Sequence, residues 1–183
     1  NMFNIAEYET PTSNLVTSLQ EQYLAVYGQY KDIITNYYYG HYHMEDLQVG
    51  AGIFGVSSLG FSVDFYNNPG FKILQINASG QLQDYISYNS QYNLERSLNW
   101  QQFYQLNAAY KINSSDYVNY FQNTLQPESD NLGWETYVYN YSGNNAAATI
   151  SQIPIVSPTY WNIYYCAVEY FAESEFNACL NRY

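Results

Sequence analysis

Apolar side chains recur at alternating spacings of three and four residues between residues 13 and 39. This spacing is typical of an amphipathic helix with a coiled-coil-like period. Ser13 is suited to cap its start and Gly40 to stop it. The stripe suits packing against the helix's own domain. It also suits an interface with other copies of the chain, because tyrosine hydroxyls need a polar partner or water. Its positions are Val16, Leu19, Tyr23, Val26, Tyr30, Ile33 and Tyr37.

A different pattern follows the helix. Apolar and polar residues alternate over residues 61–65, and Asn67–Asn68–Pro69–Gly70 is a strong turn signal. With residues 71–76 as the returning strand, this pattern predicts a β-hairpin. Residues 134–141 also alternate and predict a strand. Residues 149–156 predict an edge strand, because proline at position 154 has no N–H to donate to a neighbour.

Helical spacing returns over residues 91–126, and residues 160–171 are apolar enough to suit either a strand or a helix. Residues 1–12 are polar and predict an N-terminal arm. The pattern as a whole predicts an α+β fold in one domain over residues 13–183. Its parts are the long N-terminal helix, a mainly antiparallel β portion and additional helices.

Composition points to an unusual surface. The chain has 24 tyrosines, but only five Lys and Arg against 16 Asp and Glu. So many tyrosines exceed what one small core is expected to hold, so we expect many to lie exposed or at interfaces. Because basic residues are few and scattered, the sequence excludes nucleic-acid binding and gives no basis for stable membrane insertion.

Several features favour a secreted protein. Asn77, Asn113 and Asn140 each begin an N-glycosylation sequon. The two cysteines, Cys166 and Cys179, are expected to pair in an oxidising compartment, and the chain must then turn between them. The alternative is a pair of free buried thiols. The low charge also suits an acidic exterior, since such a fold depends little on ion pairs.

Candidate chemistry is sparse. His41 and His43, followed by Glu45, are weak candidates for a metal site, because residues two apart on a strand share a face. No later histidine completes the set. Residues 50–55 match G-x-G-x-x-G without the surrounding strand and helix that dinucleotide binding needs, so they indicate closely packed backbone instead. We therefore expect no catalytic residue and no cofactor.

The richness in Tyr, Asn, Ile and Ser, the low charge and the sequons together resemble secreted surface-filament, S-layer-associated and virion proteins of thermoacidophilic crenarchaea. The tyrosine surplus, the low charge, the heptad-like helix and the absence of a catalytic motif predict a non-enzymatic, secreted and N-glycosylated structural subunit of an extracellular assembly. It is expected at a cell or virion surface, with copies of itself as partners. Two alternatives stay open. One is a glycan-binding or adhesion module that uses exposed Tyr and Trp, and the other is a metal-dependent enzyme around His41 and His43.

Overall fold

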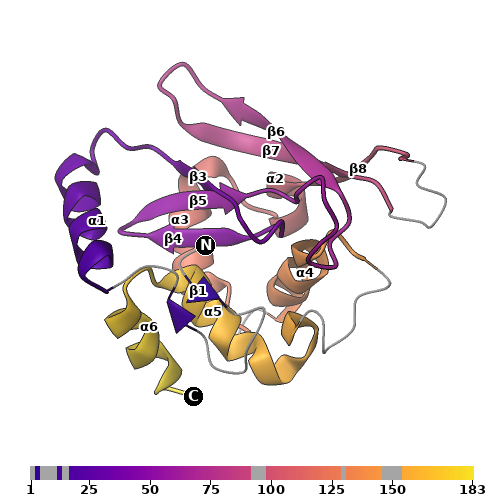
Figure 1. Ribbon diagram of the computed structural model, residues 1–183. Helices are drawn as coiled ribbons and strands as arrows, with labels where there is room; N and C mark the ends of the chain where they lie inside the picture. Colours follow the sequence, from indigo (N-terminus) through magenta and orange to yellow (C-terminus); the bar gives the residue numbers. More distant parts are fainter. Residues whose placement is uncertain (1–2, 5–11, 14–16, 92–97, 129–130, 146–153) are drawn as a thin grey trace.

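The computed structural model describes residues 3–4, 12–13, 17–91, 98–128, 131–145 and 154–183. These residues form an α+β fold in which strands and helices occupy separate layers (Figure 1). Near the N-terminus, β1 (Phe3–Asn4) pairs antiparallel with β2 (Thr12–Ser13). The rest of the predicted arm, residues 1–2 and 5–11, lies outside the described part.

The first three-stranded sheet lies at the centre of the molecule. Its order is β3 (Tyr37–Tyr39), β5 (Ile53–Ser57), β4 (Leu47–Gly50). β4 runs antiparallel to β5, whereas β3 runs parallel to it. Every residue of β4 and β5 is buried, because other elements cover both faces of these strands. This explains their continuous apolar run, which lacks the alternation of a half-exposed strand.

The second sheet is antiparallel and has the order β6 (Gly70–Ile76), β7 (Leu82–Asn89), β8 (Gln101–Gln105). Asn77 shapes the turn between β6 and β7, since its Oδ1 accepts hydrogen bonds from the backbone N–H groups of Ser79 and Gln81. Figure 1 shows the β6–β7 hairpin projecting beyond the first sheet.

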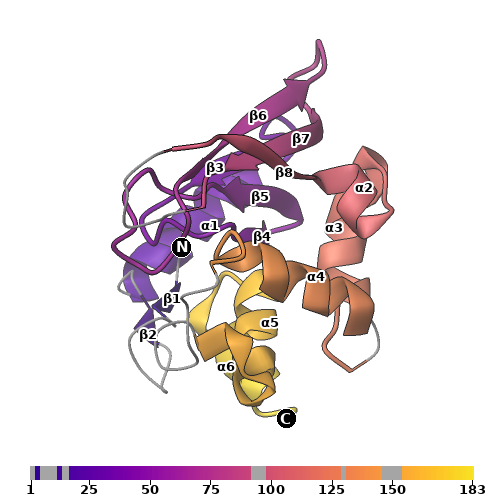
Figure 2. The same cartoon turned by 90° about the vertical axis from the view of Figure 1, so that its right-hand side faces the viewer.

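Helices cover the lower side of the sheets, where α4, α5 and α6 gather, while α2 and α3 lie at one end (Figure 2). Trp134, Tyr137 and Tyr165 pack there as fully buried rings. The helical elements are α2 (Leu106–Tyr110), η1 (Ser114–Asp116), α3 (Tyr117–Asn119), η2 (Tyr120–Thr124), α4 (Asn131–Tyr141), η3 (Pro154–Val156), η4 (Pro158–Tyr160), α5 (Trp161–Glu169) and α6 (Glu173–Leu180). None of the described helices is both long and apolar enough to cross a bilayer.

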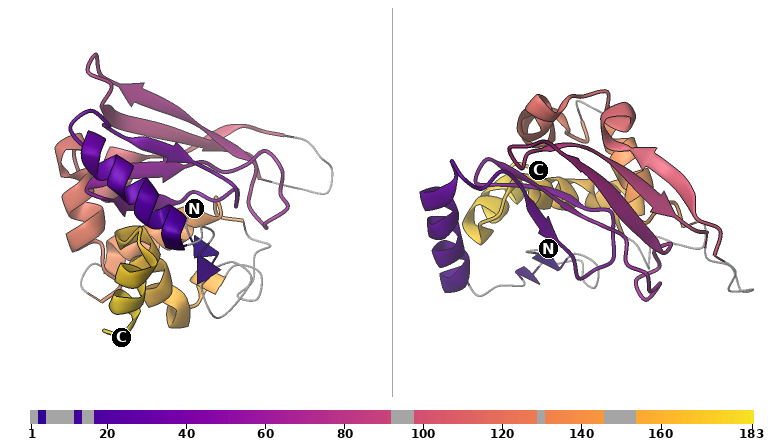
Figure 3. Two further views of the ribbon diagram at one scale, coloured as in Figure 1. Left: turned by 60° about the vertical axis from the view of Figure 1, so that its left-hand side comes forward. Right: turned by 90° about the horizontal axis from the view of Figure 1, so that it is seen from above.

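The predicted helix over residues 13–39 is wrong in length. Helix α1 spans Thr17–Tyr30, and residues 37–39 form strand β3 instead. The apolar spacing continues past residue 30, but pairing with β5 gives Tyr37 a buried place in a sheet. Tertiary pairing therefore overrides the local period. Two views from other sides show α1 along the flank of the molecule (Figure 3).

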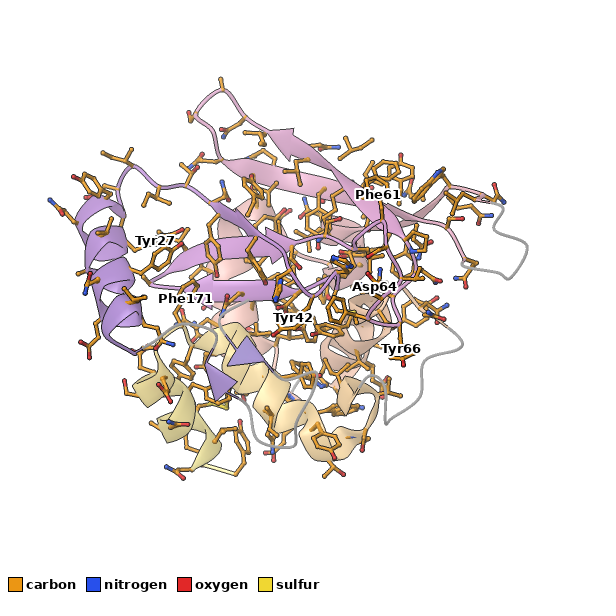
Figure 4. The ribbon with its side chains drawn as sticks, viewed as in Figure 1. Tyr27, Tyr42, Phe61, Asp64, Tyr66 and Phe171 are labelled. Atoms are coloured by element: carbon orange, nitrogen blue, oxygen red, sulfur yellow. A yellow bond between two sulfur atoms is a disulfide. The ribbon has the colours of Figure 1, made fainter. Side chains whose placement is uncertain are left out.

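Helix α1 is held to the body by aromatic contacts. The ring of Tyr27 meets those of Tyr37 and Phe171 at centroid distances of 6.0 and 6.3 Å, and Figure 4 shows Tyr27 and Phe171 facing each other. Most of the predicted stripe faces solvent, while Tyr37 is buried and Val16 lies outside the described residues. The exposed members are Leu19, Tyr23, Val26, Tyr30 and Ile33.

Other local predictions also change. Residues 61–65 are turns rather than a strand, so β6 pairs with β7 and the predicted hairpin is wrong. Residues 134–141 are helical, because Trp134, Tyr137 and Tyr141 bury one helical face. Strand β8 interrupts the predicted helical region 91–126. Residues 160–171 form mainly α5, and of the predicted strand 149–156 only residues 154–156 are described, as one 3₁₀ turn.

Candidate functional site

The segment His41–Tyr42–His43 has an unusual backbone. His41 has φ 119° and His43 has φ 59°, which are values that residues with a Cβ seldom adopt. Between them, Tyr42 is buried and packs edge-on against Phe65, with ring centroids 5.6 Å apart. Such conformations persist only where the surroundings enforce them, and they cluster at functional sites. The segment is therefore a candidate functional site.

His43 forms a hydrogen bond with a serine from a distant loop. Its Nδ1 lies 2.9 Å from Ser62 Oγ, and Phe65 lies edge-on to the imidazole, with centroids 5.2 Å apart. When the imidazole carries its proton on Nε2, Nδ1 accepts the hydrogen bond from the Ser62 hydroxyl. A hydroxyl donating to an imidazole is the arrangement from which a serine nucleophile is activated.

The loop that carries Ser62 is held in place by a buried amide. Asn67 is fully buried, and its Nδ2 donates to the carbonyl oxygens of Gly60, Ser62 and Asn68 at 3.3, 3.0 and 3.1 Å. Gly60 lets His43 approach, because a Cβ at that position would lie 2.3 Å from the imidazole Cγ. Asn67 and Gly60 thus position the serine and the histidine relative to each other.

A pocket of about 380 Å³ opens between the two sheets, next to this loop. Phe61, the neighbour of Ser62, forms part of its wall and is 73% exposed (Figure 4). Ser57, Ser58 and Lys72 contribute polar groups, and Ser58 Oγ is buried without a hydrogen-bond partner among the described residues. The remaining wall is mostly apolar, from Tyr38, Val56, Leu59, Phe71 and Leu74. The pocket suits an apolar group carrying a polar function at one end.

A buried ion pair lies behind the pocket. Lys72 Nζ is 2.7 Å from Glu45 Oε2, and their side chains are 4% and 0% exposed. Glu45 also accepts hydrogen bonds from Ser87 Oγ and from the hydroxyl of Tyr104. Lys72 donates to the carbonyl oxygen of Ser57 as well. Burial lowers the pKa of Lys72, while the attraction of Glu45 opposes that shift. Each group is satisfied internally, so the pair joins the two sheets, and Lys72 also forms part of the pocket wall.

Asp46 is the second buried carboxylate. Its Oδ1 accepts hydrogen bonds from the Tyr137 hydroxyl at 2.7 Å and from the Leu47 N–H at 2.9 Å. Burial raises the pKa of Asp46 above its ordinary value, and these hydrogen bonds oppose the rise. Glu45 and Asp46 are adjacent in the chain but serve different partners.

The structure does not bring the candidate metal ligands together. Glu45 is committed to Lys72, His43 to Ser62, and the ring of His41 packs against Tyr42. In the described part of the chain, no three His, Cys, Asp or Glu side chains gather as a metal-binding group. These residues therefore do not fit a metal ion, and we assign no step of chemistry to one held by them.

The cysteines and the sequons lie in different settings. Cys166 and Cys179 form a disulfide with Cα atoms 5.8 Å apart, and the chain turns between α5 and α6. Asn113 is exposed and Asn77 lies in an exposed turn. Asn140 is only 3% exposed within α4, where the folded protein has no room for a glycan.

Ser62 is absent from the sequence-derived candidates, because nothing local marks it. It lies in a turn-rich loop, and 18 residues of other structure separate it from His43. The chain offers one local signal, the pair of histidines, and as a pair they predict metal ligands. The structure gives the two histidines different surroundings, since His43 forms a hydrogen bond with Ser62 while His41 is exposed at the surface.

No protein-family model matches the chain. It is similar to acid sphingomyelinase-like phosphodiesterase 3b of Mus musculus, with 25% identity over 184 aligned residues. The alignment covers 90% of this chain and 39% of the relative, so the chain spans about two fifths of the length of that curated protein.

This similarity corrects the functional interpretation of the composition. A relative that is a phosphodiesterase contradicts the structural subunit of a filament, lattice or virion, and it contradicts the expectation that the chain is not an enzyme. The resemblance to crenarchaeal surface proteins is also wrong, because it rested on residue frequencies that unrelated proteins share. The alternative of a metal-dependent enzyme around His41 and His43 agrees better with the similarity, because it is an enzyme. Its proposed metal ligands do not gather among the described residues.

Proposed function

We propose that this chain is part of a hydrolase that cleaves phosphodiesters, with Ser62 and His43 in its active site. The similarity to a phosphodiesterase over 90% of the chain carries the proposal. The hydrogen bond between Ser62 Oγ and His43 Nδ1 supports it from the geometry, as do the enforced φ angle of His43 and the buried Asn67 that holds the serine loop.

The chemistry that this pair supports is a double displacement. Ser62 Oγ attacks phosphorus while its proton passes to His43 Nδ1. The bond from phosphorus to one alcohol breaks, and that alcohol leaves with the proton from the imidazolium. Water then attacks the phosphoserine, His43 accepts the water's proton, and Ser62 regains its hydroxyl as the phosphomonoester leaves. Each alcohol and proton is accounted for without another reactant.

The pocket between the sheets supports a substrate with an apolar group. Phe61 is adjacent to Ser62 and also lines the pocket, so an apolar substituent held there would lie near the serine. The relative's name describes it as sphingomyelinase-like. We therefore propose a phosphodiester with an apolar substituent as the substrate class.

We place the protein in an oxidising compartment outside the cytoplasm, as an extension of the same proposal. The disulfide between Cys166 and Cys179 supports this location, because such bonds form and persist in oxidising surroundings. Burial raises the pKa of Asp46, because a buried carboxylic acid is more stable neutral than ionised. An acidic medium keeps this carboxyl group neutral and therefore suits the fold.

Hydrolysis of bis(4-nitrophenyl) phosphate tests the function. We expect turnover by the unaltered chain. Ser62→Ala and His43→Ala should each lower kcat by about 10²- to 10⁴-fold. His41→Ala is the matched control, because His41 is exposed and is not bonded to Ser62, and it should retain activity.

Three results would contradict the proposal. The first is absence of phosphodiester turnover together with hydrolysis of 4-nitrophenyl butyrate, which would make the chain a carboxylesterase. The second is absence of turnover of either ester. The third is turnover that a chelator abolishes and that Ser62→Ala leaves unchanged, which would remove the serine from the chemistry. Circular dichroism of each variant separates loss of the fold from loss of the reaction.

A further inference from the structure

A second pocket, of about 320 Å³, lies where β7 ends, β8 begins and the chain leaves α4. It is separate from the pocket beside Ser62 and shares none of its lining residues. Its volume is at the lower end of the range of roughly 300 to 1,000 Å³ that small-molecule sites occupy. The site is therefore large enough for a small ligand.

Side-chain amides dominate the wall of this pocket. Its amide residues are Asn89, Gln91, Asn99, Gln101, Gln102 and Asn144. Each amide offers two N–H donors and a carbonyl acceptor. Within the described part of the chain, the side chains of Gln101 and Gln102 form no hydrogen bond with the protein, and both are exposed on β8. Their donors and acceptors are available to a ligand.

Two aromatic rings complete the wall. The centroids of Phe103 and Tyr139 are 5.7 Å apart and their planes are inclined by 32°. Tyr139 is 52% exposed, and its hydroxyl accepts a hydrogen bond from Asn144 Nδ2 at 2.9 Å. The faces of such rings carry negative charge density and attract the weakly positive C–H groups of a ligand.

The backbone beneath the pocket is fixed in advance. The carbonyl oxygen of Gly143 accepts hydrogen bonds from Asn68 Nδ2 at 2.8 Å and from Asn89 Nδ2 at 2.7 Å, and both asparagines are buried. These bonds hold the turn after α4, in which Gly143 and Asn144 both have positive φ. The position of Asn144, and through it the hydroxyl of Tyr139, is therefore set before any ligand arrives, which lowers the entropy cost of binding.

We propose that this pocket binds a neutral saccharide. None of the described residues that line it is charged, so these residues offer no ion pair to an anionic or cationic ligand. Hydroxyl groups both donate and accept hydrogen bonds, which matches a wall of amides. The C–H faces of a pyranose ring match the rings of Phe103 and Tyr139. A saccharide meets both requirements, whereas an apolar ligand would leave the amides unsatisfied.

Isothermal titration calorimetry with neutral trisaccharides tests the site, using maltotriose, cellotriose, mannotriose and chitotriose as probes. We expect at least one of them to bind. Tyr139→Ala should weaken that affinity by about fivefold or more, because the stacking ring is lost. Gln101→Ala should weaken it too, and Gln75→Ala is the matched control, since Gln75 is exposed on β6 outside the pocket.

The proposal is overturned if none of the four sugars binds at millimolar concentration. It is equally overturned if a sugar binds Tyr139→Ala and Gln101→Ala with the same affinity as it binds the unaltered protein. Loss of binding in Phe61→Ala alone would also overturn it, because the sugar would then lie in the pocket between the sheets. The Ser62→Ala variant should bind the sugar unchanged. The saccharide site and the hydrolase activity can therefore fail independently of each other.

Discussion

Some buried tyrosine hydroxyls find partners inside this protein because two carboxylates are buried with them. Tyr104 donates to Glu45, Tyr137 donates to Asp46, and Tyr85 and Tyr104 share a hydrogen bond of 2.6 Å between their hydroxyls. At least ten tyrosines are buried in the described residues, more than the composition led us to expect. Each ring adds apolar area to the core, while its hydroxyl avoids an unpaired polar atom where such a partner is present.

Asp46 gives the stability of the protein a pH dependence with a definite sign. Because burial raises the folded-state pKa of Asp46, the folded state binds the proton more tightly than the unfolded chain. This contribution is fully present below the unfolded pKa of about 3.9 and is lost as the pH rises through the folded pKa. Asp46→Asn keeps a neutral hydrogen-bond acceptor for the Tyr137 hydroxyl. It should therefore reduce the fall in the free energy of unfolding as the pH rises.

Urea unfolding at a series of pH values from about 3.5 to 7.5, which covers the carboxyl titration, measures this effect. We expect the free energy of unfolding to fall less steeply with rising pH in Asp46→Asn than in the unaltered protein. Asp64→Asn removes an exposed carboxylate and is the control. Equal slopes for Asp46→Asn and the unaltered protein would show that Asp46 does not cause the dependence.

Two glycines make a matched test of close packing. A Cβ on Gly55 would lie 2.1 Å from the Tyr37 ring, so Gly55→Ala should destabilise the protein by about 1–3 kcal/mol. A Cβ on Gly28 in α1 would meet nothing within 4 Å, so Gly28→Ala should stabilise the protein by about 0.5–1 kcal/mol. Thermal and urea unfolding give both values. A destabilised Gly28→Ala or an unaffected Gly55→Ala would contradict this packing.

At the level of secondary-structure elements, the C-terminal helices depend on a covalent link. Cys166 in α5 and Cys179 in α6 are both buried and are bonded 13 residues apart. Arg182 extends the junction beyond α6, where its Nη2 lies 3.5 Å from Glu169 Oε2. That guanidinium is about half exposed, so the ion pair adds little and the disulfide is the stronger constraint.

Replacing both cysteines by serine should lower the free energy of unfolding by about 3 kcal/mol, the value expected for a closed loop of this length. In the chain-entropy account, the protein is destabilised because the unfolded chain gains conformational entropy when the disulfide no longer closes a loop. Equilibrium unfolding with and without a reductant provides the measurement. A reductant should destabilise the unaltered protein and leave Cys166→Ser/Cys179→Ser unchanged. A response by the serine variant would mean that the reductant acts elsewhere.

At the scale of the whole molecule, the buried ion pair between Lys72 and Glu45 joins the two sheets. Lys72 comes from β6 of the second sheet, whereas Glu45 precedes β4 of the first. Ser57 at the end of β5 and Ser87 and Tyr104 in β7 and β8 complete the contact from both sides. The sheets should therefore unfold as one cooperative unit.

A double-mutant cycle measures this connection. Lys72→Met leaves the Glu45 carboxylate buried without its cation, and Glu45→Gln leaves the Lys72 ammonium without its anion. Each substitution should lower the free energy of unfolding by about 3–5 kcal/mol. The double variant should cost clearly less than the sum, because it removes both charges together. Urea unfolding gives the three values. Additive losses would show that the two groups do not stabilise each other.

The fold class and several elements follow from the order of residues alone. Alternation and turn residues predict the strand at 71–76, and the apolar spacing predicts the helical turns around Val118 and Phe121. Low charge and a tyrosine surplus are also properties of the chain before it folds. These features are local, since side chains a few residues apart decide them.

The location of the chemistry, in contrast, depends on how the chain packs. Packing places Tyr37 in a sheet instead of a helix, and it makes residues 134–141 helical by burying the face that carries Trp134. It also gives His41 and His43 different partners, and it brings Ser62 to His43 across 19 positions of the chain. Contacts of this length depend on how elements meet in space, and no local period of hydrophobic and polar residues records them.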